Sequence, residues 1–279
     1  MDNVNNRLTE EEEALLSQAL IEAHEEPKQE SNDLPVNSPS LLVDEIHSRF
    51  SSAEWFKEIQ KQSVLLAGLG GIGSWTALLL SRANIGQLII YDDDTVDKTN
   101  MSGQLYSSSQ IGQYKSYATY NNIRNLSEFT NVISCCRRFE RDRRGHRIMI
   151  GGFDNMIARR DFYESWKREV LGSRPDERKN FLLIDARLAA EELQVFCITG
   201  VDQFLMKKYE EEWLFNDSEA DETLCSYKQT SFCANMTASI IVNLVVNFVA
   251  NKCNPLIERE LPFYTNYDAT TMRLKTYTV

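Results

Sequence analysis

The sequence predicts an α/β fold: a Rossmann-like, mostly parallel sheet with helices on both faces and mixed strands at one edge. Three observations indicate it. Short apolar runs alternate with segments of helical spacing between residues 64 and 185, which is typical of buried parallel strands joined by helices. A glycine-rich turn connects the first strand to the first helix. Near the C-terminus, alternating segments indicate strands of mixed direction.

The elements are expected in the following order. Helical spacing over residues 41–60 marks the entry into the folded domain. Strands are then predicted at 64–69, 87–91, 131–136, 146–150, 181–185, 193–199 and 271–279, with helices at 73–83, 117–126, 159–171 and 234–251. The first strand, turn, helix and second strand form one β-α-β unit.

The chain divides into an acidic tail at 1–40 and one folded domain at 41–279. The net charge is -11, and residues 1–45 carry twelve acidic residues against Arg7 and Lys28. Such a composition buries too little apolar surface to order itself, so we expect a flexible tail. A capping box formed by Thr9 and Glu12 precedes an apolar stripe, so a short helix is predicted at 9–23. That helix is either transient or a docking helix for a partner.

Composition also bounds the function. The folded part is nearly neutral, so nucleic acid is not an expected partner. Residues 238–250 are the longest apolar candidate for a membrane span, but Asn243 and Asn247 interrupt them, and none is expected. The N-terminus does not resemble a targeting segment, which predicts a cytoplasmic location. The six cysteines form no CxxC pair, so structural zinc and disulfides are not expected.

A glycine-rich turn follows the first predicted strand. Gly68, Gly70 and Gly73 form a GxGxxG pattern, and Gly71 adds a fourth glycine. Glycines let backbone N–H groups approach a phosphate, and the following helix N-terminus favours negative charge. Asp92 ends the second strand 19 residues after Gly73, where a carboxylate can accept both hydroxyls of a ribose. The turn therefore predicts a nucleotide site.

The stretch after the second strand carries a more specific signature. It runs Tyr-Asp-Asp-Asp-Thr-Val-Asp-Lys-Thr-Asn-Met-Ser-Gly-Gln over residues 91–104, followed by Ile-Gly-Gln-Tyr-Lys over 111–115 and Asp-Asn-Met-Ile-Ala-Arg over 154–159. This series of motifs resembles the ThiF/MoeB-type adenylyltransferases of the ubiquitin-activating-enzyme-like superfamily. The resemblance covers most of residues 49–250.

The resemblance implies an enzyme that binds ATP and Mg²⁺ and adenylates a carboxylate, releasing pyrophosphate. The implied substrate is the C-terminus of a ubiquitin-like or sulfur-carrier protein, and the implied assembly is a homodimer. Lys115 is expected on the phosphates and Asp154 on Mg²⁺. The expected nucleotide-binding residues are Gly68, Gly70, Gly71, Gly73, Asp92, Asp94, Asn100, Gln104, Lys115 and Asn155.

Two positions depart from the family pattern. Gly103 stands where an arginine is expected before Gln104, and Ser52 stands where a second arginine would reach the ATP of the partner subunit. Arg49 and Arg82 are considered as substitutes. Arg159 either follows the family pattern or simply pairs with a neighbour on a solvated face.

Three further features leave alternatives open. Cys225 is either a catalytic, thioester-forming cysteine or an inert one, while Cys135, Cys136, Cys197, Cys233 and Cys253 are expected in the core. The Asp185-Ala186-Arg187 segment either lines the substrate channel or forms an ordinary ion pair. The acidic stretch at 207–224 is interpreted as a loop, over that channel or simply solvated.

Two other functions compete with adenylation. An NAD(P)-dependent oxidoreductase would also need the glycine turn and Asp92, but would give Asn100, Gln104, Lys115 and Asp154 no role. A non-catalytic, activating-enzyme-like interaction module would explain the arginine missing at Gly103.

Overall fold

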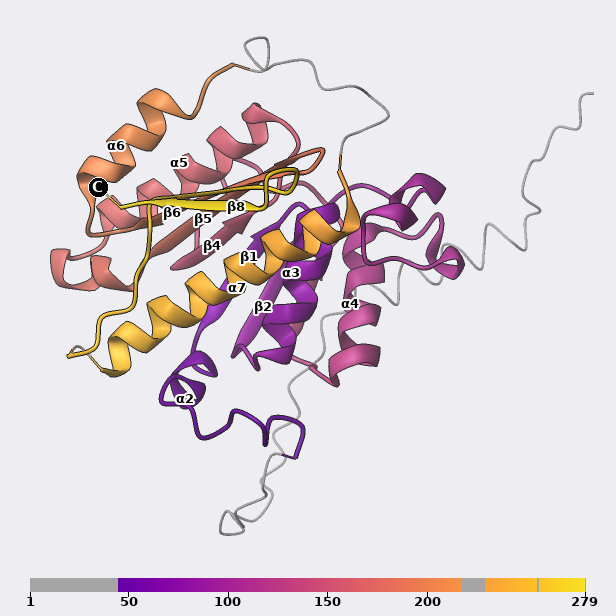
Figure 1. Cartoon of the computed structure of the whole chain (residues 1–279), viewed down its shortest axis with the longest axis horizontal. Coiled ribbons are helices and arrows are strands. Elements are labelled where there is room, and N and C mark those ends of the chain that lie inside the picture. The colour runs from indigo at the N-terminus through magenta and orange to yellow at the C-terminus, as the bar shows by residue number, and fades with distance from the viewer. Residues whose placement is uncertain (1–44, 217–228, 255, 279) are drawn as a thin grey trace, which may run out of the picture. The chain divides into compact units, whose positions relative to one another are not determined.

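The computed structural model describes residues 45–216, 229–254 and 256–278, whose strands form one eight-stranded sheet in the order β3-β2-β1-β4-β5-β6-β7-β8 (Figure 1). The predicted tail at 1–40, its helix at 9–23 and the domain boundary lie outside the described residues, and so does Cys225.

The sheet has a parallel part and an antiparallel edge. Strands β1 (Ser63–Ala67), β2 (Gln87–Tyr91), β3 (Val132–Cys135), β4 (Ile148–Gly151) and β5 (Leu182–Ala189) run parallel. Strands β6 (Glu192–Thr199), β7 (Tyr264–Asp268) and β8 (Arg273–Tyr277) pair antiparallel. The mostly parallel sheet with mixed strands at one edge is therefore confirmed. Because β1 lies centrally between β2 and β4, the turn that follows it opens at the middle of the sheet.

Helices cover both faces of the sheet (Figure 1). One face is covered by α3 (Gly71–Arg82), α4 (Lys115–Ser127) and α7 (Ser231–Cys253). The other face is covered by α5 (Met156–Gly172) and α6 (Gln203–Glu212). Short 3-10 turns lie at η1 (Lys98–Ser102), η2 (Ser108–Gln110) and η3 (Pro175–Asn180). The chain thus forms the predicted three layers.

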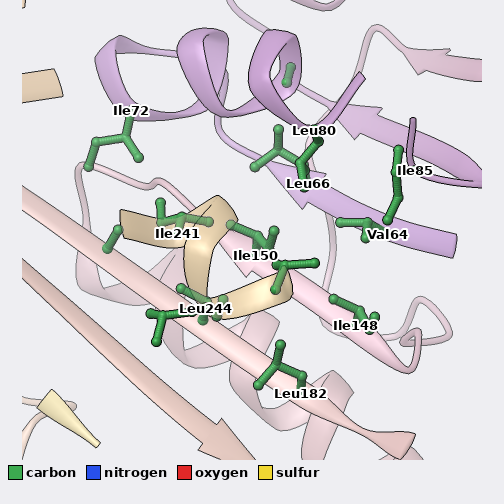
Figure 2. Packing of buried hydrophobic residues seen from close by; sticks show 14 of the residues in the cluster. Val64, Leu66, Ile72, Leu80, Ile85, Ile148, Ile150, Leu182, Ile241 and Leu244 are labelled. Carbon is green, nitrogen blue, oxygen red and sulfur yellow. The ribbon is translucent and has the colours of Figure 1, made fainter. Parts of the chain in front are cut away.

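Alternate residues of the central strands fill the two halves of the core. Val64 and Leu66 pack beneath α3 and α7 (Figure 2), whereas Leu65 and Ala67 join the cluster beneath α5 and α6. This division follows from the two-residue period of a strand. Burying each large apolar side chain contributes roughly 1.5–3 kcal/mol, so β1 is anchored from both sides and fixes the start of the glycine turn.

Helix α7 is the one described helix that is long and apolar enough to cross a membrane by length and composition. Half of that apolar window is buried within the fold. Ile241 and Leu244 pack against the strands of the sheet (Figure 2). A core helix of an α/β domain meets the same criterion, and α7 has that role here.

Three sequence expectations differ from the structure. Residues 45–54 form turns and only α2 (Phe56–Ile59) is helical. The turns bring His47, Phe50 and Trp55 into tilted or edge-on contact with Phe56. The predicted helix at 41–60 is therefore confirmed at 56–59 and wrong over 45–54.

The expected acidic loop at 207–224 begins as a helix. Asp202 caps α6 by accepting a hydrogen bond from Leu205 N, and Met206 and Tyr209 bury one helical face. The acidic residues on the other face pair with lysines at i,i+4 spacing, as in Lys208–Glu212. Residues 217–224 lie outside the described part. Strand β7 was also not predicted.

Candidate nucleotide site

The glycine turn between β1 and α3 is closed by backbone contacts. Gly68 adopts φ +82, a left-handed conformation that favours glycine. A Cβ on Gly73 would lie 1.8 Å from the carbonyl oxygen of Gly68, and one on Gly68 would lie 2.6 Å from that of Gly152. The turn therefore requires glycine at both positions. It places the N-terminus of α3 at the carboxyl end of the parallel strands.

Asp92 is bound directly to this turn. Its Oδ2 accepts a hydrogen bond from Leu69 N at 2.6 Å, and its Oδ1 accepts one from Asp94 N at 2.8 Å. Burial raises the pKa of Asp92 above its ordinary value, while the Leu69 N–H and the charge of Lys115 act in the opposite direction. A fixed, partly desolvated carboxylate beside a glycine turn is suited to accept ribose hydroxyls.

Lys115 begins α4 and faces the same loop. Its Nζ lies 2.8 Å from Asp94 Oδ2, and its backbone N–H donates to Asp94 O at 2.8 Å. The Lys115 side chain is 10% exposed, whereas that of Asp94 is 63% exposed. The pair therefore holds the nearly buried ammonium of Lys115 at the site. If Lys115 binds another anion instead, solvent can stabilise the exposed carboxylate of Asp94.

The loop after β2 carries Asn100 and Gln104. Asn100 Oδ1 accepts a hydrogen bond from Asp97 N at 2.8 Å, which closes the capping box of η1. Gln104 is 9% exposed, and its Oε1 has no hydrogen-bond partner among the described residues. Its Nε2 lies 4.0 Å from the position of a Cβ on Gly70. Buried polar atoms are normally paired, so Gln104 lies beside the glycine turn with an oxygen that has no partner in the described part of the chain.

This loop is fastened to the first turns of α3. Ser74 Oγ accepts a hydrogen bond from Leu105 N at 3.0 Å, and Trp75 Nε1 donates to Gly103 O at 3.3 Å. Tyr106 Oη donates to Leu69 O at 2.7 Å, and burial raises the pKa of this phenol so that it stays protonated. Sequence reasoning missed Ser74, Trp75 and Tyr106, because their partners lie more than 25 residues away and no local pattern marks them.

Asp154 and Asn155 follow β4 at the same edge. Gly152 N donates to Ala67 O at 2.9 Å, which sets this segment against the glycine turn. Asp154 is exposed and its Oδ1 accepts from Asn155 Nδ2 at 3.1 Å. Asn155 also caps α5 by accepting from Ala158 N at 2.8 Å. An exposed carboxylate suits Mg²⁺, which commonly takes one or two carboxylates together with substrate phosphates.

A second group of oxygen donors lies nearby. Carboxylate oxygens of Asp92, Asp93 and Asp94 lie within 4.8 Å of one another. Asp93 pairs with Arg138 at 2.9 Å, and Asp94 pairs with Lys115. Since both oxygens of Asp92 already accept backbone N–H bonds and Asp93 pairs with Arg138, this group suits Mg²⁺ less well than the exposed Asp154.

The structure places neither arginine substitute in this site. Arg82 ends α3, a helix of 12 residues that starts at the glycine turn, so it lies about 17 Å along the helix from its start. It donates to Leu126 O. Arg49 lies in the turns before α2, and Gly86 N donates to Ile59 O, which ties that segment to the amino end of β2. Arg82 is therefore wrong as a substitute in this site, whereas Arg49 as a contact to the ATP of a partner subunit stays a prediction.

Arg159 is buried rather than on a solvated face. It donates to Asp185, to Ala186 O and to Phe153 O. Arg187 donates to the other oxygen of Asp185 at 3.0 Å. Asp185 and Arg187 therefore form an ion pair, as one of the two alternatives expected, within a buried cluster that also includes Arg159. Through Arg159 this cluster joins α5 to β5 and contacts Phe153, the residue before Asp154.

The described cysteines are not uniformly in the core. Cys197 and Cys233 are buried, and burial raises the pKa of Cys197 to about 12. Cys135 is half-buried, and Cys136 and Cys253 are exposed. Cys136 directly follows the last residue of β3 and Cys253 is the last residue of α7, and element ends are exposed. The core prediction is wrong for these two.

Comparison with known proteins identifies relatives by sequence. A family model described as the ThiF family matches residues 43–279. Ubiquitin-like modifier-activating enzyme 5 of Arabidopsis thaliana is 33% identical over 98 residues, 33% of this chain and 23% of that protein. Adenylyltransferase and sulfurtransferase UBA4 of Lodderomyces elongisporus is 33% identical over 113 residues, 37% and 24% of the two chains. The matches span about a quarter of these relatives' length.

Solved structures show the same fold. PaaA superimposes with a TM-score of 0.64 at 16% identity, covering 99% of this chain and 84% of that one. Escherichia coli MccB with ATP superimposes with a TM-score of 0.63 at 14% identity, covering 98% and 80%. At these identities the likeness concerns the fold.

Proposed function

This chain belongs to the ThiF family, and on that premise we propose that it is an ATP-dependent adenylyltransferase acting on a carboxylate. One observation carries the proposal. The carboxyl ends of β1, β2 and β4 bring the glycine turn, Asp92, Lys115 and the Asp154 segment to one edge, beside Gln104, whose buried Oε1 has no partner among the described residues. Ligands of open α/β sheets bind at this edge.

Each residue has a role in nucleotide binding. Asp92 accepts the ribose hydroxyls, and the N–H groups at the start of α3 face the phosphates. The ammonium of Lys115 exchanges Asp94 for a phosphate oxygen, which costs little because Asp94 is 63% exposed and becomes hydrated. Gln104 supplies an amide at the same turn.

The reaction joins a carboxylate to the α-phosphorus of ATP. A carboxylate oxygen forms the new O–P bond while the bond from the α-phosphorus to the bridging oxygen breaks, and pyrophosphate leaves with that electron pair. No proton moves, so the protein's contribution is alignment and neutralisation of charge on the phosphates. Lys115 and the N-terminus of α3 are the groups of this chain that place positive charge against the phosphates.

Asp154 would hold Mg²⁺, because its exposed carboxylate meets the hard-oxygen preference of that ion. The ion neutralises phosphate charge when it is bound. Asn155 orients the carboxylate through its Nδ2 and at the same time fixes the start of α5.

The substrate proposed is the C-terminus of a ubiquitin-like or sulfur-carrier protein, since relatives carry the names ubiquitin-like modifier-activating enzyme 5 and adenylyltransferase and sulfurtransferase UBA4. A homodimer and a cytoplasmic location remain predictions from the sequence. Sedimentation velocity tests the dimer.

ATP–pyrophosphate exchange with a cognate substrate tests the proposal. Lys115→Ala and Asp154→Ala should each lower the exchange rate by on the order of a hundredfold, as loss of a charge-stabilising contact does. Asp176→Ala, a change of an exposed carboxylate in η3, should leave it unchanged. Exchange at the wild-type rate in both site variants would contradict the assignment.

The absence of an arginine at Gly103 also supports a second candidate, an activating-enzyme-like interaction module that binds MgATP without turning it over. Binding without exchange, measured with the cognate substrate, would favour it. An NAD(P)-dependent oxidoreductase leaves Gln104, Lys115 and Asp154 without roles, and stabilisation by NADH but not by MgATP in a thermal-shift assay would favour it.

A further inference from the structure

Gln229 enters the nucleotide site from a segment distant in sequence. It directly precedes Thr230, the N-cap of α7, and its backbone forms an isolated parallel bridge with Ala190 just after β5. Helix α7 packs along α3 (Figure 1). The bridge and the helix together fix where the Gln229 side chain enters the site.

The amide of Gln229 lies between two glycines. A Cβ on Gly71 would lie 2.1 Å from Gln229 Oε1, and one on Gly103 would lie 3.3 Å from its Nε2 and 3.2 Å from its Cγ. Gly71 is the first residue of α3, and Gly103 is the position where an arginine is expected. Gln229 therefore fills space that a side chain at either position would need.

The surroundings of this amide indicate a ligand. Among the described residues no side chain caps α3, and its first turn contains no acidic residue, so these residues supply no anionic cap to its N-terminal N–H groups. Gln104, beside Gly70, is 9% exposed, and its Oε1 has no partner in ranges 45–216, 229–254 and 256–278. Two side-chain amides thus flank one helix N-terminus, and within these ranges one of them carries an unpaired buried oxygen.

An amide suits both states of such a site. With no anion bound, the oxygen of Gln229 lies toward the positive end of α3, which is electrostatically favourable. A half-turn about the last side-chain bond exchanges oxygen for the NH₂ group, because the two ends have nearly the same shape. The NH₂ group can then donate to an anion held at the helix N-terminus.

We propose that Gln229 binds the phosphate chain of the nucleotide, in the space that a side chain at position 103 would otherwise occupy. The inference rests on the proposed function, because it takes a nucleotide as the ligand. It assigns a phosphate contact to a residue outside the motifs at 64–115 and 154–159. Gln229 also couples nucleotide binding to the start of α7.

Calorimetric titration of the full chain with MgATP tests this role. Gln229→Ala should weaken binding by about tenfold, the value of one hydrogen bond to a charged group. Gln229→Glu should weaken binding more, because a carboxylate repels phosphate. Its melting temperature should nevertheless match or exceed that of the wild type, because a negative charge near the N-terminus of α3 is stabilising. A purely structural Gln229 would instead lower the melting temperature in both variants.

A rescue experiment separates the position from the residue. Gly103→Arg combined with Gln229→Ala should recover binding, because the vacated space admits a guanidinium. Gly103→Arg alone should improve the affinity for MgATP less than it does in the Gln229→Ala background, since the new Cβ would contact Gln229. Gln203→Ala, an exposed glutamine in the first turn of α6, is the matched control and should bind MgATP as the wild type does.

The outcomes distinguish this inference from the proposed function. If the wild type binds no MgATP, both fail. If the wild type binds but Gln229→Ala and Gln229→Glu bind as tightly, only the role of Gln229 is overturned. Tighter binding by Gln229→Ala would also overturn it, by showing that the amide obstructs the phosphate position.

Discussion

Replacing Gly73 with alanine perturbs the glycine turn at its tightest contact. The added Cβ would lie 1.8 Å from the carbonyl oxygen of Gly68, and a carbon and an oxygen need a separation of more than 3 Å. Both sides of this contact are backbone, so no side chain can move aside. Helix α3 and the turn must separate, which pulls Leu69 N away from Asp92.

The structure sets the size of the effect. Overpacking that forces backbone shifts costs about 3 kcal/mol of unfolding free energy. Gly112 has φ +86 but nothing within 4 Å of its Cβ position, so Gly112→Ala should cost only the conformational strain, about 1 kcal/mol. Gly172 has neither feature, and Gly172→Ala should be neutral or stabilise by about 0.5 kcal/mol.

Urea denaturation of the three variants measures these differences, and titration with MgATP measures the consequence for binding. Gly73→Ala should lose detectable MgATP binding under conditions where the protein is still folded, because the turn and Asp92 are no longer in register. Gly172→Ala should bind as the wild type does. A Gly73→Ala protein with wild-type stability and affinity would refute the account of the turn.

Three further changes test charges. Because burial raises the pKa of Asp92, urea denaturation should show the wild type losing stability relative to Asp92→Asn as the pH rises from about 3.8 to neutral. The variant should also bind MgATP more weakly by calorimetry, since it loses a carboxylate oxygen that accepts a backbone N–H. Burial lowers the pKa of Lys252 to about 8 from 10.5, so denaturation should show the wild type gaining stability between pH 8 and 10.5 relative to Lys252→Met. Arg159→Met should destabilise by about 3 kcal/mol in urea because it breaks a buried ion pair with Asp185, whereas exposed Arg174→Met should change stability by less than about 1 kcal/mol.

The sequence predicted the elements whose stability comes from local pattern. The apolar run around Val64 and the glycines after it specify a buried strand and a tight turn, and both appear where expected. Strand β7 was missed because Tyr264–Asp268 contains Asn and Asp, and only the pairing with β6 buries Thr265 and Tyr267. The acidic stretch from 207 resembles a charged loop in composition, but its lysines and glutamates lie four residues apart, which is the spacing of ion pairs on a helix.

The site was predictable only in part for the same reason. The motifs placed Asp92 and Lys115 at one edge of the sheet, but the pairing of Lys115 with Asp94 depends on the path of the intervening loop. Arg159 finds its partner 26 residues away in β5. Gln229 has no local signature at all, and only the space left by Gly71 and Gly103 identifies it.

The most direct test of the account is a calorimetric titration of MgATP into the wild type and into Lys115→Met. The wild type should bind MgATP, and Lys115→Met should bind it at least tenfold more weakly, because a charge-assisted phosphate contact is lost. Stability should change little, since the Asp94 left behind is 63% exposed. Equal affinity of the two proteins, or no binding by the wild type, would contradict the claim that this edge of the sheet holds ATP.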